Sequence, residues 1–333
     1  MKVTAVVTTY NRFELAKRAI RSVISQTYNS LEIIVVEDSG DSGIEGWLAQ
    51  FCDQNIKYIQ HPTNRGLAAA RNTAIKMAEG EYIAFLDDDD EWKPMRVEKQ
   101  MDLIRALSRE AREKCGVVSC CVETVINNGK YISVARAGNI GNMKEAIMEN
   151  GMITPSSTFL FSKFALQEVN GFDEELPSSI DHDIWMSLAT RGYDAWAVEE
   201  ALVVDYGREG RNTMMSDTVY RIKGVRMFVE KWMPSFHEWF GDVAGLKYGK
   251  RYFARVIIHL SVSKILSGNF KDAWQALEAV FDFNDETSYN LKILFKQFLV
   301  RGAKRIIPYR FREFLKQYAW LSFLKGKTGL GAK

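Results

Sequence analysis

Four consecutive aspartates, Asp87 to Asp90, follow directly on an apolar run, and Glu91 extends them to five acids in a row. Adjacent carboxylates repel one another, so a strand that ends in such a cluster usually needs a positive partner there. A divalent cation is suited to this place, because hard cations prefer carboxylate oxygens and accept water and phosphate as further ligands. The alternative is a solvated acidic turn in front of a helix that begins at Lys93-Pro94.

The first 110 residues alternate between β-rich apolar runs and helical patterns, which predicts a mostly parallel sheet covered by helices on both faces. Ligands of such sheets gather at the carboxyl ends of the strands. Polar residues follow three of these strands, at 8–11, 37–39 and 87–90. Their convergence favours a ligand site over a solvated turn. The expected strands are 3–9, 31–36, 57–60 and 81–86, and the expected helices are 12–27, 44–51, 66–78 and 94–107.

The pattern after residue 110 is less regular. A hairpin is expected over 116–134 around Asn127-Asn128-Gly129. From about residue 215 the pattern is helical, with a helical hairpin between 250 and 282. The other expected elements are a strand over 155–161, helices over 162–169 and 181–190, and a strand over 195–205.

The composition allows a substantial core, since 47% of the 333 residues are hydrophobic. Four cysteines without a CxxC pair fit reduced thiols in the cytosol. The chain enters its first strand without a signal-peptide pattern. No run approaches the roughly 20 apolar residues of a membrane-spanning helix. A cytoplasmic location is therefore expected.

The formal charge of +2 is unevenly distributed, because residues 291–333 carry eleven Lys or Arg and one acid, a net charge of +10. Phe311, Phe314 and Tyr318 recur at helical spacing among these bases. A basic helix with a bulky apolar stripe is expected to lie on an anionic membrane surface. The alternatives are packing against the rest of the chain or against a second subunit in a homo-oligomer. No recognition fold accompanies the tail, so nucleic acid is not an expected partner.

Five motifs, in this order, resemble family 2 glycosyltransferases of the GT-A fold. They are VVTTYNR at 6–12, VVEDS at 35–39, NRG and AARN within 64–72, FLDDDDEW at 85–92, and GFDE at 171–174 followed by DHDIW at 181–185. The resemblance covers roughly residues 1–212. It implies a GT-A catalytic domain over 1–212, with a nucleotide-sugar half of about 1–110 and an acceptor half of about 111–212. Residues 213–333 would form a helical, basic extension.

The donor of such an enzyme is a nucleotide-diphosphate sugar. Tyr10 offers a ring for the base, the Thr8 hydroxyl a directional hydrogen bond, and Asp38 an acceptor for an imide N–H. Glu37 stands where the family usually has a first Asp, and Arg65 is expected to pair with the base or the diphosphate. The resemblance implies ribose contact by Asp88 and metal binding by Asp89. Asp87 would support Mn²⁺ or Mg²⁺ directly or through water.

The acceptor hydroxyl needs a base, and the position that matches the family's base is Asp181. A helix N-cap is the structural alternative for this residue and is compatible with the catalytic role. Arg208 lies where many relatives have a histidine, and its guanidinium is suited to clamping a diphosphate. One base opposite a metal-held leaving group favours direct in-line displacement, which inverts the anomeric configuration.

The sequence therefore predicts an inverting, metal-dependent transferase that moves a sugar from a UDP- or dTDP-type donor to a glycan or lipid-linked glycan. The reaction would take place at the inner face of the cytoplasmic membrane. Two alternatives stay open. A glycan hydrolase could use two carboxylates such as Asp89 and Asp181, and a non-catalytic membrane-bound scaffold could have kept the fold.

Overall fold

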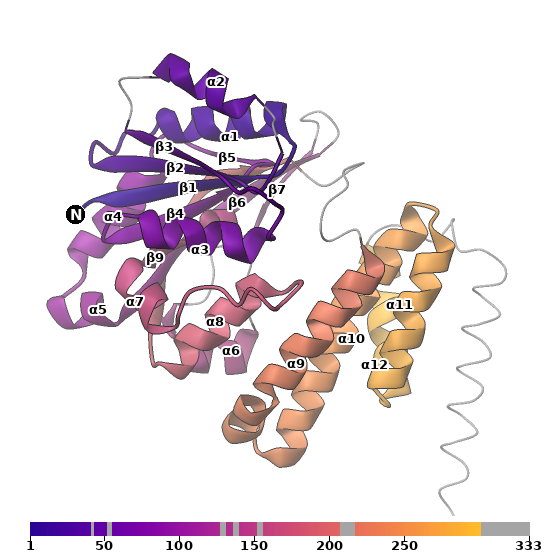
Figure 1. Cartoon of the computed structure of the whole chain (residues 1–333). Coiled ribbons are helices and arrows are strands. Elements are labelled where there is room, and N and C mark those ends of the chain that lie inside the picture. Colours follow the sequence, from indigo (N-terminus) through magenta and orange to yellow (C-terminus); the bar gives the residue numbers. More distant parts are fainter. Residues whose placement is uncertain are drawn as a thin grey trace, which may run out of the picture. The chain divides into compact units, whose positions relative to one another are not determined.

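The computed structural model describes residues 1–40, 43–51, 55–126, 131–135, 140–151, 156–206 and 217–300. The chain forms two compact units (Figure 1). Unit 1 contains Met1–Leu176 and Ile180–Arg211, and unit 2 contains Pro177–Ser179 and Asn212–Lys333.

The amino-terminal part of the unit 1 sheet is parallel. Its four strands lie in the order β3-β2-β1-β4, with β2 and β4 on either side of β1. All seven residues of β1 are buried, so both faces of the sheet are covered at this point. The strands are β1 (Val3–Thr9), β2 (Leu31–Glu37), β3 (Ile56–Gln60) and β4 (Tyr82–Asp87).

The sheet continues beyond β4 as a mixed sheet, in the order β9-β6-β10-β5. The short strand β9 runs antiparallel to both β4 and β6, whereas β6 and β10 are parallel to each other. Strand β7 pairs with β6 and β8 pairs with β10. The bounds are β5 (Asp90–Trp92), β6 (Cys115–Ile126), β7 (Tyr131–Ala135), β8 (Gly141–Asn142), β9 (Leu160–Ser162) and β10 (Asp194–Asp205).

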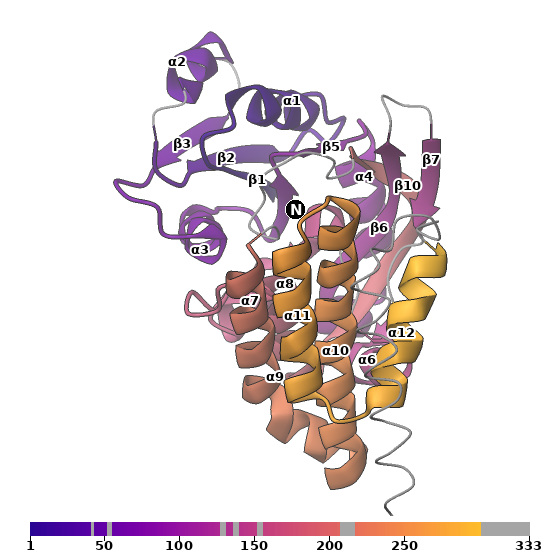
Figure 2. The ribbon, with the colours of Figure 1, turned by 90° about the vertical axis from the view of Figure 1, so that its right-hand side faces the viewer.

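Helices cover both faces of this sheet. Val3, Ala5 and Val7 of β1 pack in one apolar cluster with residues of helices α1 (Phe13–Ile24) and α4 (Arg96–Ala106). Helix α3 (Leu67–Met77) packs against β1 and β2, and Figure 2 shows α1 and α3 on opposite sides of these strands. The remaining helices of unit 1 are α2 (Ile44–Leu48), α5 (Arg109–Lys114), α6 (Met143–Asn150), α7 (Lys163–Glu168) and α8 (Ile180–Thr190).

The alternation predicted for the first 110 residues is confirmed, and so is the predicted α/β class with carboxyl-terminal helices. The predicted hairpin is also confirmed by the antiparallel pairing of β6 with β7, although its turn at 127–130 lies outside the described residues. The strand predicted over 155–161 is misplaced, because only Leu160 and Phe161 of this range belong to a strand. A 3₁₀ helix occupies Ser156–Thr158, and the strand β9 begins at Leu160.

Strand β5 was not predicted either, because the sequence favours a helix directly after the acid run. Residues Asp90–Trp92 instead pair antiparallel with Val203–Asp205 of β10, and α4 begins only at Arg96. This pairing joins segments more than 100 residues apart, so no local pattern reveals it.

Unit 2 is helical in its described part. It contains α9 (Thr218–Phe240), α10 (Asp242–Leu266), α11 (Phe270–Phe283) and α12 (Thr287–Val300). Phe228, Phe236 and Phe253 are fully buried in it. A Cβ at Gly245 would lie 2.4 Å from the carbonyl oxygen of Phe236, so α9 and α10 approach closely there only because the residue is glycine. The predicted helical hairpin is confirmed by α10 and α11. Among the described residues, no helix has the length and apolar character needed to cross a bilayer.

Candidate active site at the carboxyl ends of the strands

The three polar strand ends meet at one edge of the sheet. In the parallel pairing, Thr8 of β1 lies opposite Val36 of β2 and Asp87 of β4. Thr9 of β1 lies opposite Glu37 of β2. Parallel pairing therefore brings the ends of β1, β2 and β4 together, as the sequence predicts. Of the predicted site residues, Thr8, Tyr10, Glu37, Asp38 and the acid run all lie at this edge.

A buried arginine joins the acid run to the predicted base. The Arg71 guanidinium lies 2.8 Å from Asp87 Oδ1 and 2.6 Å from Asp181 Oδ1, and its side chain is only 1% exposed. Ser156 adds a hydroxyl that donates to Asp87 at 2.9 Å. Burial by itself lowers the pKa of Arg71, but the carboxylates of Asp181 and Asp87 outweigh it and raise this pKa. Arg71 therefore stays charged and holds both carboxylates.

Asp88 and Asp89 face the start of α1. The Thr9 hydroxyl donates to Asp88 Oδ2 at 2.8 Å, and Arg12 Nη1 lies 2.9 Å from Asp88 Oδ1 and 3.6 Å from Asp89 Oδ2. Burial raises the pKa of Asp88 to about 6, although Arg12 and Thr9 act in the opposite direction. The second acid of the run is thus held by an arginine and a hydroxyl.

Asp90 differs from its neighbours because it is a buried strand residue opposite Asp205. Burial and the nearby carboxylate of Asp87 raise the pKa of Asp90 well above its ordinary value. Burial therefore disfavours the charged form of Asp90.

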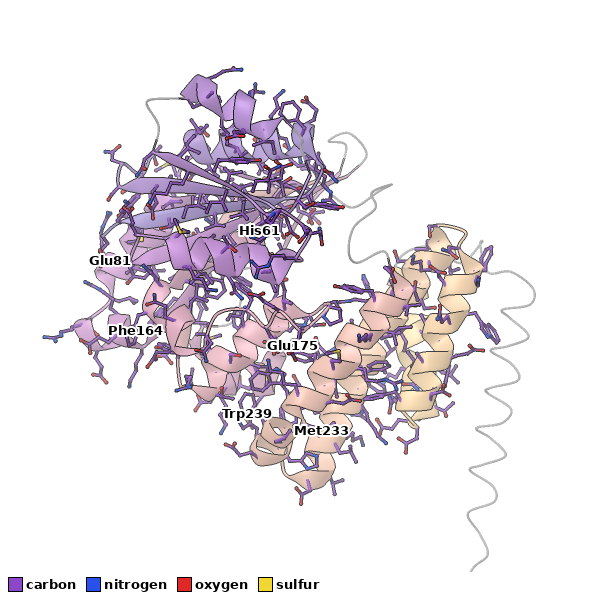
Figure 3. All side chains as sticks on the ribbon, in the orientation of Figure 1. His61, Glu81, Phe164, Glu175, Met233 and Trp239 are labelled. Atoms are coloured by element: carbon purple, nitrogen blue, oxygen red, sulfur yellow. The ribbon has the colours of Figure 1, made fainter. Side chains whose placement is uncertain are left out.

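Asp38 holds the loop that follows β3. Its carboxylate accepts hydrogen bonds from the amides of Arg65 at 2.8 Å and Gly66 at 2.7 Å, and lies 2.8 Å from His61 Nδ1. The other ring nitrogen of His61 lies 2.9 Å from the Thr73 hydroxyl of α3. Figure 3 labels His61 next to α3. Asp38 thus fixes residues 61–66, the segment that begins α3, in addition to its predicted role toward the base.

The other predicted nucleotide-binding residues are placed differently from one another. Tyr10 is 48% exposed and Thr8 is buried. Glu37 is fully buried and accepts a hydrogen bond from the Tyr58 hydroxyl at 2.6 Å. The Arg65 side chain pairs with Glu174 at 3.1 Å. Arg208, the predicted diphosphate ligand, lies outside the described residues.

Asp181 is the second residue of α8 rather than its N-cap, since the helix begins at Ile180. Its side chain is 28% exposed. Asp183 is buried, so it points elsewhere, as helical spacing predicts. Asn72, next to Arg71, donates to the Phe172 carbonyl oxygen at 2.7 Å and accepts from the Phe172 amide at 2.8 Å. The motif of α3 therefore fixes the segment that leads toward α8.

Sequence reasoning gave no role to Arg71, Arg12 and Ser156, although the first two lie in motifs that it quoted. A signal for Arg71 was present, since an arginine inside the apolar helix segment Leu67–Met77 needs a buried counter-charge. Ser156 gave no such signal, because its partner Asp87 is 69 residues away.

The acid run suits a divalent cation by the chemistry of its donors. The side chains of Asp87 and Asp89 are 30% and 18% exposed, so both carboxylates are accessible. Within the described ranges, no three His, Cys, Asp or Glu side chains gather as a metal cage. Two carboxylates are enough for Mg²⁺ and Mn²⁺ in phosphate-binding sites, where substrate oxygens and water complete the coordination. The residues present therefore fit such an ion.

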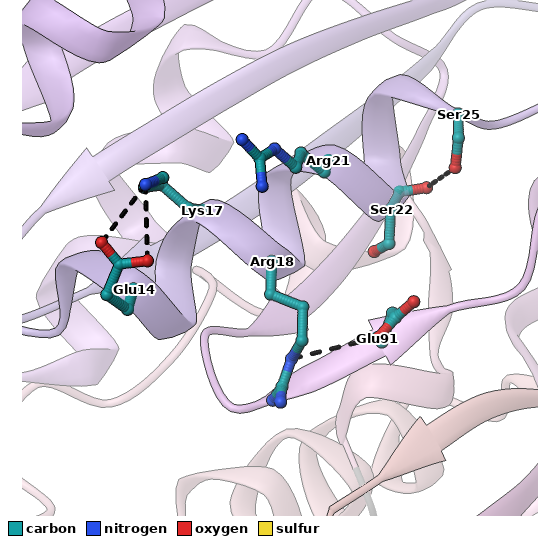
Figure 4. Close-up of a pocket in the computed structure, with 7 residues that line it drawn as sticks. All are labelled: Glu14, Lys17, Arg18, Arg21, Ser22, Ser25 and Glu91. Carbon is teal, nitrogen blue, oxygen red and sulfur yellow. Dashed lines mark hydrogen bonds and ion pairs between the residues drawn. The ribbon is translucent and has the colours of Figure 1, made fainter.

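An open pocket of about 530 Å³ lies on the outer side of α1 beside β5 (Figure 4). Its residues include Lys17, Arg18 and Arg21, and none of them was predicted as a site residue. Arg18 donates to the carbonyl oxygen of Asp89 at 2.7 Å, and its guanidinium lies 3.8 Å from the ring centre of Tyr206. From this side the protein holds the backbone of the acid run.

The fold is a mostly parallel α/β sheet flanked by helices. The predicted nucleotide-binding residues and the acid run lie at the carboxyl edge of its strands β1, β2 and β4. This arrangement is that of a GT-A-like fold. The family model for glycosyl transferase family 2 matches residues 4–169. A candidate colanic acid biosynthesis glycosyl transferase of Escherichia coli K12, WcaA, is 31% identical over 212 residues, which are 62% of this chain and 73% of that protein. The chain belongs to glycosyl transferase family 2.

Other relatives are longer or more distant. An uncharacterized glycosyltransferase of Rickettsia bellii is 32% identical over 56% of this chain, which spans only 27% of that protein. A β-1,3-glucosyltransferase of Escherichia coli, WfaP, whose name gives UDP-Glc as donor and α-D-GlcNAc-diphosphoundecaprenol as acceptor, is 27% identical over 66% of this chain and 77% of its own length.

Solved structures share the fold. TarS residues 1–349 of S. aureus, solved with UDP-GlcNAc, superimposes with a TM-score of 0.62 at 21% identity and covers 88% of this chain and 83% of its own. The mannosyltransferase PcManGT of Pyrobaculum calidifontis, solved with GDP-Man and Mn²⁺, has a TM-score of 0.53 at 18% identity. That match covers 96% of this chain and 84% of PcManGT.

Proposed function

We propose that this protein is an inverting, metal-dependent glycosyltransferase that moves a sugar from a nucleotide-diphosphate sugar to a glycan or lipid-linked glycan. One observation carries the proposal above the others. Arg71 binds Asp87, a predicted metal ligand, and Asp181, the predicted base, in one buried bridge. The predicted metal ligand, which serves the donor, and the predicted base, which serves the acceptor, are thus held at a fixed distance from each other. Transfer of a sugar from one substrate to the other requires such a fixed arrangement.

Asp181 is the proposed general base. It is partly exposed, and its partner Arg71 orients the carboxylate without covering it. The base removes the proton from the acceptor hydroxyl as the oxygen attacks the anomeric carbon. Attack from the side opposite the leaving diphosphate inverts the anomeric configuration.

The leaving diphosphate needs positive charge. Asp89 and Asp87 would hold a Mn²⁺ or Mg²⁺ ion, which when bound neutralises charge on the departing oxygens. Arg208 is the proposed diphosphate ligand from the protein itself. Thr8, Tyr10, Glu37, Asp38, Arg65 and Asp88 are proposed to bind the nucleoside.

A UDP-type donor and a lipid-diphosphate acceptor are supported by the relatives. WfgD of Escherichia coli is described by the same donor, acceptor and linkage as WfaP. It is 35% identical over 102 residues, which are 31% of this chain and 40% of WfgD. The structural relative TarS was solved with UDP-GlcNAc. We therefore favour UDP-glucose or UDP-GlcNAc over dTDP-sugars for the first assays.

A lipid-linked acceptor places the reaction at the inner face of the cytoplasmic membrane. Residues 291–333, with their net charge of +10, are the proposed contact with anionic lipid. In the described part of this segment, Lys292, Phe295 and Lys296 of α12 are exposed, and Phe295 is 65% exposed. Residues 301–333 lie outside the described ranges.

The test is calorimetric titration of UDP into the full chain with and without Mn²⁺, on wild type and Asp89→Asn. We expect UDP binding to tighten with Mn²⁺ in the wild type and to lose this dependence in the variant. We also expect kcat to fall by roughly two orders of magnitude or more, because charge stabilisation of the leaving group is lost. Asp102→Asn, an exposed aspartate of α4, is the control.

Metal-independent binding, or none, in the wild type would overturn the proposed mechanism. It is also the result that a two-carboxylate hydrolase or a non-catalytic scaffold predicts. Analysis of the anomeric configuration of the product by NMR then checks inversion separately.

A further inference from the structure

Arg12 pairs with the carboxylates of both Asp88 and Asp89. It occupies the N-cap position of α1, and its Nη1 lies 2.9 Å from Asp88 Oδ1 and 3.6 Å from Asp89 Oδ2. Its side chain is 27% exposed. A single guanidinium therefore shares its charge between the predicted ribose ligand and the predicted main metal ligand.

Among the described residues, Arg71 and Arg18 also contact the acid run, each in a different way. Arg71 is 1% exposed and is fixed between Asp87 and Asp181. Arg18 binds the carbonyl oxygen of Asp89, not its carboxylate. Arg12 is the one of these three that pairs with the Asp89 carboxylate while keeping a partly exposed side chain.

We propose that Arg12 is an exchangeable counter-ion, which neutralises Asp89 in the metal-free protein and releases this carboxylate when a divalent cation binds. The proposal rests on the metal site of the proposed function. Asp88 keeps its hydrogen bond from Thr9 when Arg12 moves, and the exposed part of Arg12 gives it access to solvent.

The physical reason is that the Asp89 carboxylate would have two competing cationic partners, the Arg12 guanidinium and the divalent ion. A guanidinium about 3.6 Å from Asp89 repels a divalent ion on that carboxylate. Metal binding therefore includes the loss of the Arg12–Asp89 contact, which lowers the apparent metal affinity. In return, Arg12 offsets the charge of the Asp88 and Asp89 carboxylates in the metal-free protein.

The experiment measures Mn²⁺ binding to the full chain without nucleotide, by calorimetry and by the EPR signal of free Mn²⁺. The variants are Arg12→Gln and Arg12→Lys, with Arg21→Gln as the control. Arg21 belongs to the same helix and its guanidinium lies 5.5 Å from the ring centre of Trp47, so its loss removes the same charge without removing the contact with Asp88 and Asp89. We expect Arg12→Gln to bind Mn²⁺ about tenfold tighter or more, because a repulsive charge is gone. Arg12→Lys and Arg21→Gln should stay within about threefold of wild type.

Thermal unfolding gives a second measurement. Arg12→Gln should unfold at a lower temperature than wild type without metal, and Mn²⁺ should raise its unfolding temperature by more than it raises that of wild type. If Arg12→Gln does not fold, the side-chain NMR signal of Arg12 in wild type, assigned with Arg12→Lys, should change on titration with Mg²⁺.

The outcomes distinguish a failure of the Arg12 exchange from a failure of the proposed metal site. Equal or weaker Mn²⁺ binding by Arg12→Gln, or equal tightening in Arg21→Gln, overturns the exchange, as does an Arg12 signal that Mg²⁺ leaves unchanged while Mg²⁺ binds. A wild-type protein that binds no divalent ion even with UDP present overturns the metal site of the proposed function instead.

Discussion

Arg71 is the residue on which the candidate site depends most at the scale of single side chains. It is almost completely buried, and both of its carboxylate partners remain partly exposed. A buried guanidinium is stable only when its charge is paired, so the two acids and the arginine stabilise one arrangement together. Asp87 and Asp181, to which the sequence assigns separate roles, are therefore coupled through Arg71.

Replacing Arg71 by Met should lower the free energy of unfolding by about 2–3 kcal/mol, because Asp87 and Asp181 lose their shared partner. The partial exposure of these carboxylates keeps the loss below that of a fully buried pair. Denaturant unfolding measures it. The matched control is Arg65→Met, which removes an ion pair with a side chain 45% exposed and should change stability by less than about 1 kcal/mol.

A second variant of Arg71 tests whether this residue positions the base. Arg71→Lys keeps the charge but cannot bridge two carboxylates with a planar fork. We expect its kcat to fall more than its KM for the donor rises. A kcat equal to that of wild type would contradict the positioning role.

At the scale of elements, the turn between α3 and β4 depends on a buried acid at the amino-terminal edge of the sheet. Glu32 of β2 accepts hydrogen bonds from the amides of Glu79 and Gly80, at 2.5 and 3.1 Å, and from the Thr4 hydroxyl. Burial by itself raises the pKa of Glu32, but these hydrogen bonds and Lys2 outweigh it and lower the pKa below 4.5. Strand β4, which leads into the acid run, is thereby fixed at its start.

The pH dependence follows from the sign of this shift. A folded-state pKa below the unfolded value contributes stability above the unfolded pKa and loses it as the pH falls through the folded pKa. We expect Glu32→Gln to be less stable than wild type at pH 7, with a difference that shrinks as the pH falls below about 4.5. Urea unfolding between pH 3 and 7 measures this. A difference that is constant with pH would show that Glu32 acts only through packing.

At this scale the sequence predicted most elements of unit 1, because a strand buried on both faces and an amphipathic helix leave strong local patterns. It missed β5, β8, α5 and α6, and it misplaced a strand over 155–161. Two of these errors concern segments whose structure depends on distant partners: Asp90 pairs with Asp205 of β10, and Ser157 accepts on its carbonyl oxygen from the Trp92 indole at 3.0 Å.

At the scale of the whole molecule, the charge of the chain is divided between its parts. The net charge of +10 over 291–333 predicts attraction to anionic lipid, and it is offset by a net charge of −8 in the rest of the chain. Under the proposed function, membrane contact would bring the candidate site to its lipid-linked acceptor.

The full chain should sediment with vesicles that contain about 30% phosphatidylglycerol and should stay in solution with neutral vesicles, because the interaction is electrostatic. Raising the salt concentration to 0.5 M should release it. Changing Lys292, Lys296 and Arg301 to Gln should weaken binding about 100-fold, at roughly 1 kcal/mol for each of the three charges. The control changes Arg109 and Lys114, exposed bases of α5, to Gln. Equal loss in both variants would contradict a specific role of 291–333.

The alternation of strands and helices over the first 110 residues and the sheet edge where the polar residues meet were determined by the sequence alone, since each depends on local periodicity and on the topology of parallel strands. Only the tertiary structure decided which charges pair. Arg71 is 110 residues from Asp181, and Arg12 is 76 residues from Asp88. Side chains this far apart meet only when the sheet and its helices are packed, so the counter-ions of the acid run cannot be read from local sequence.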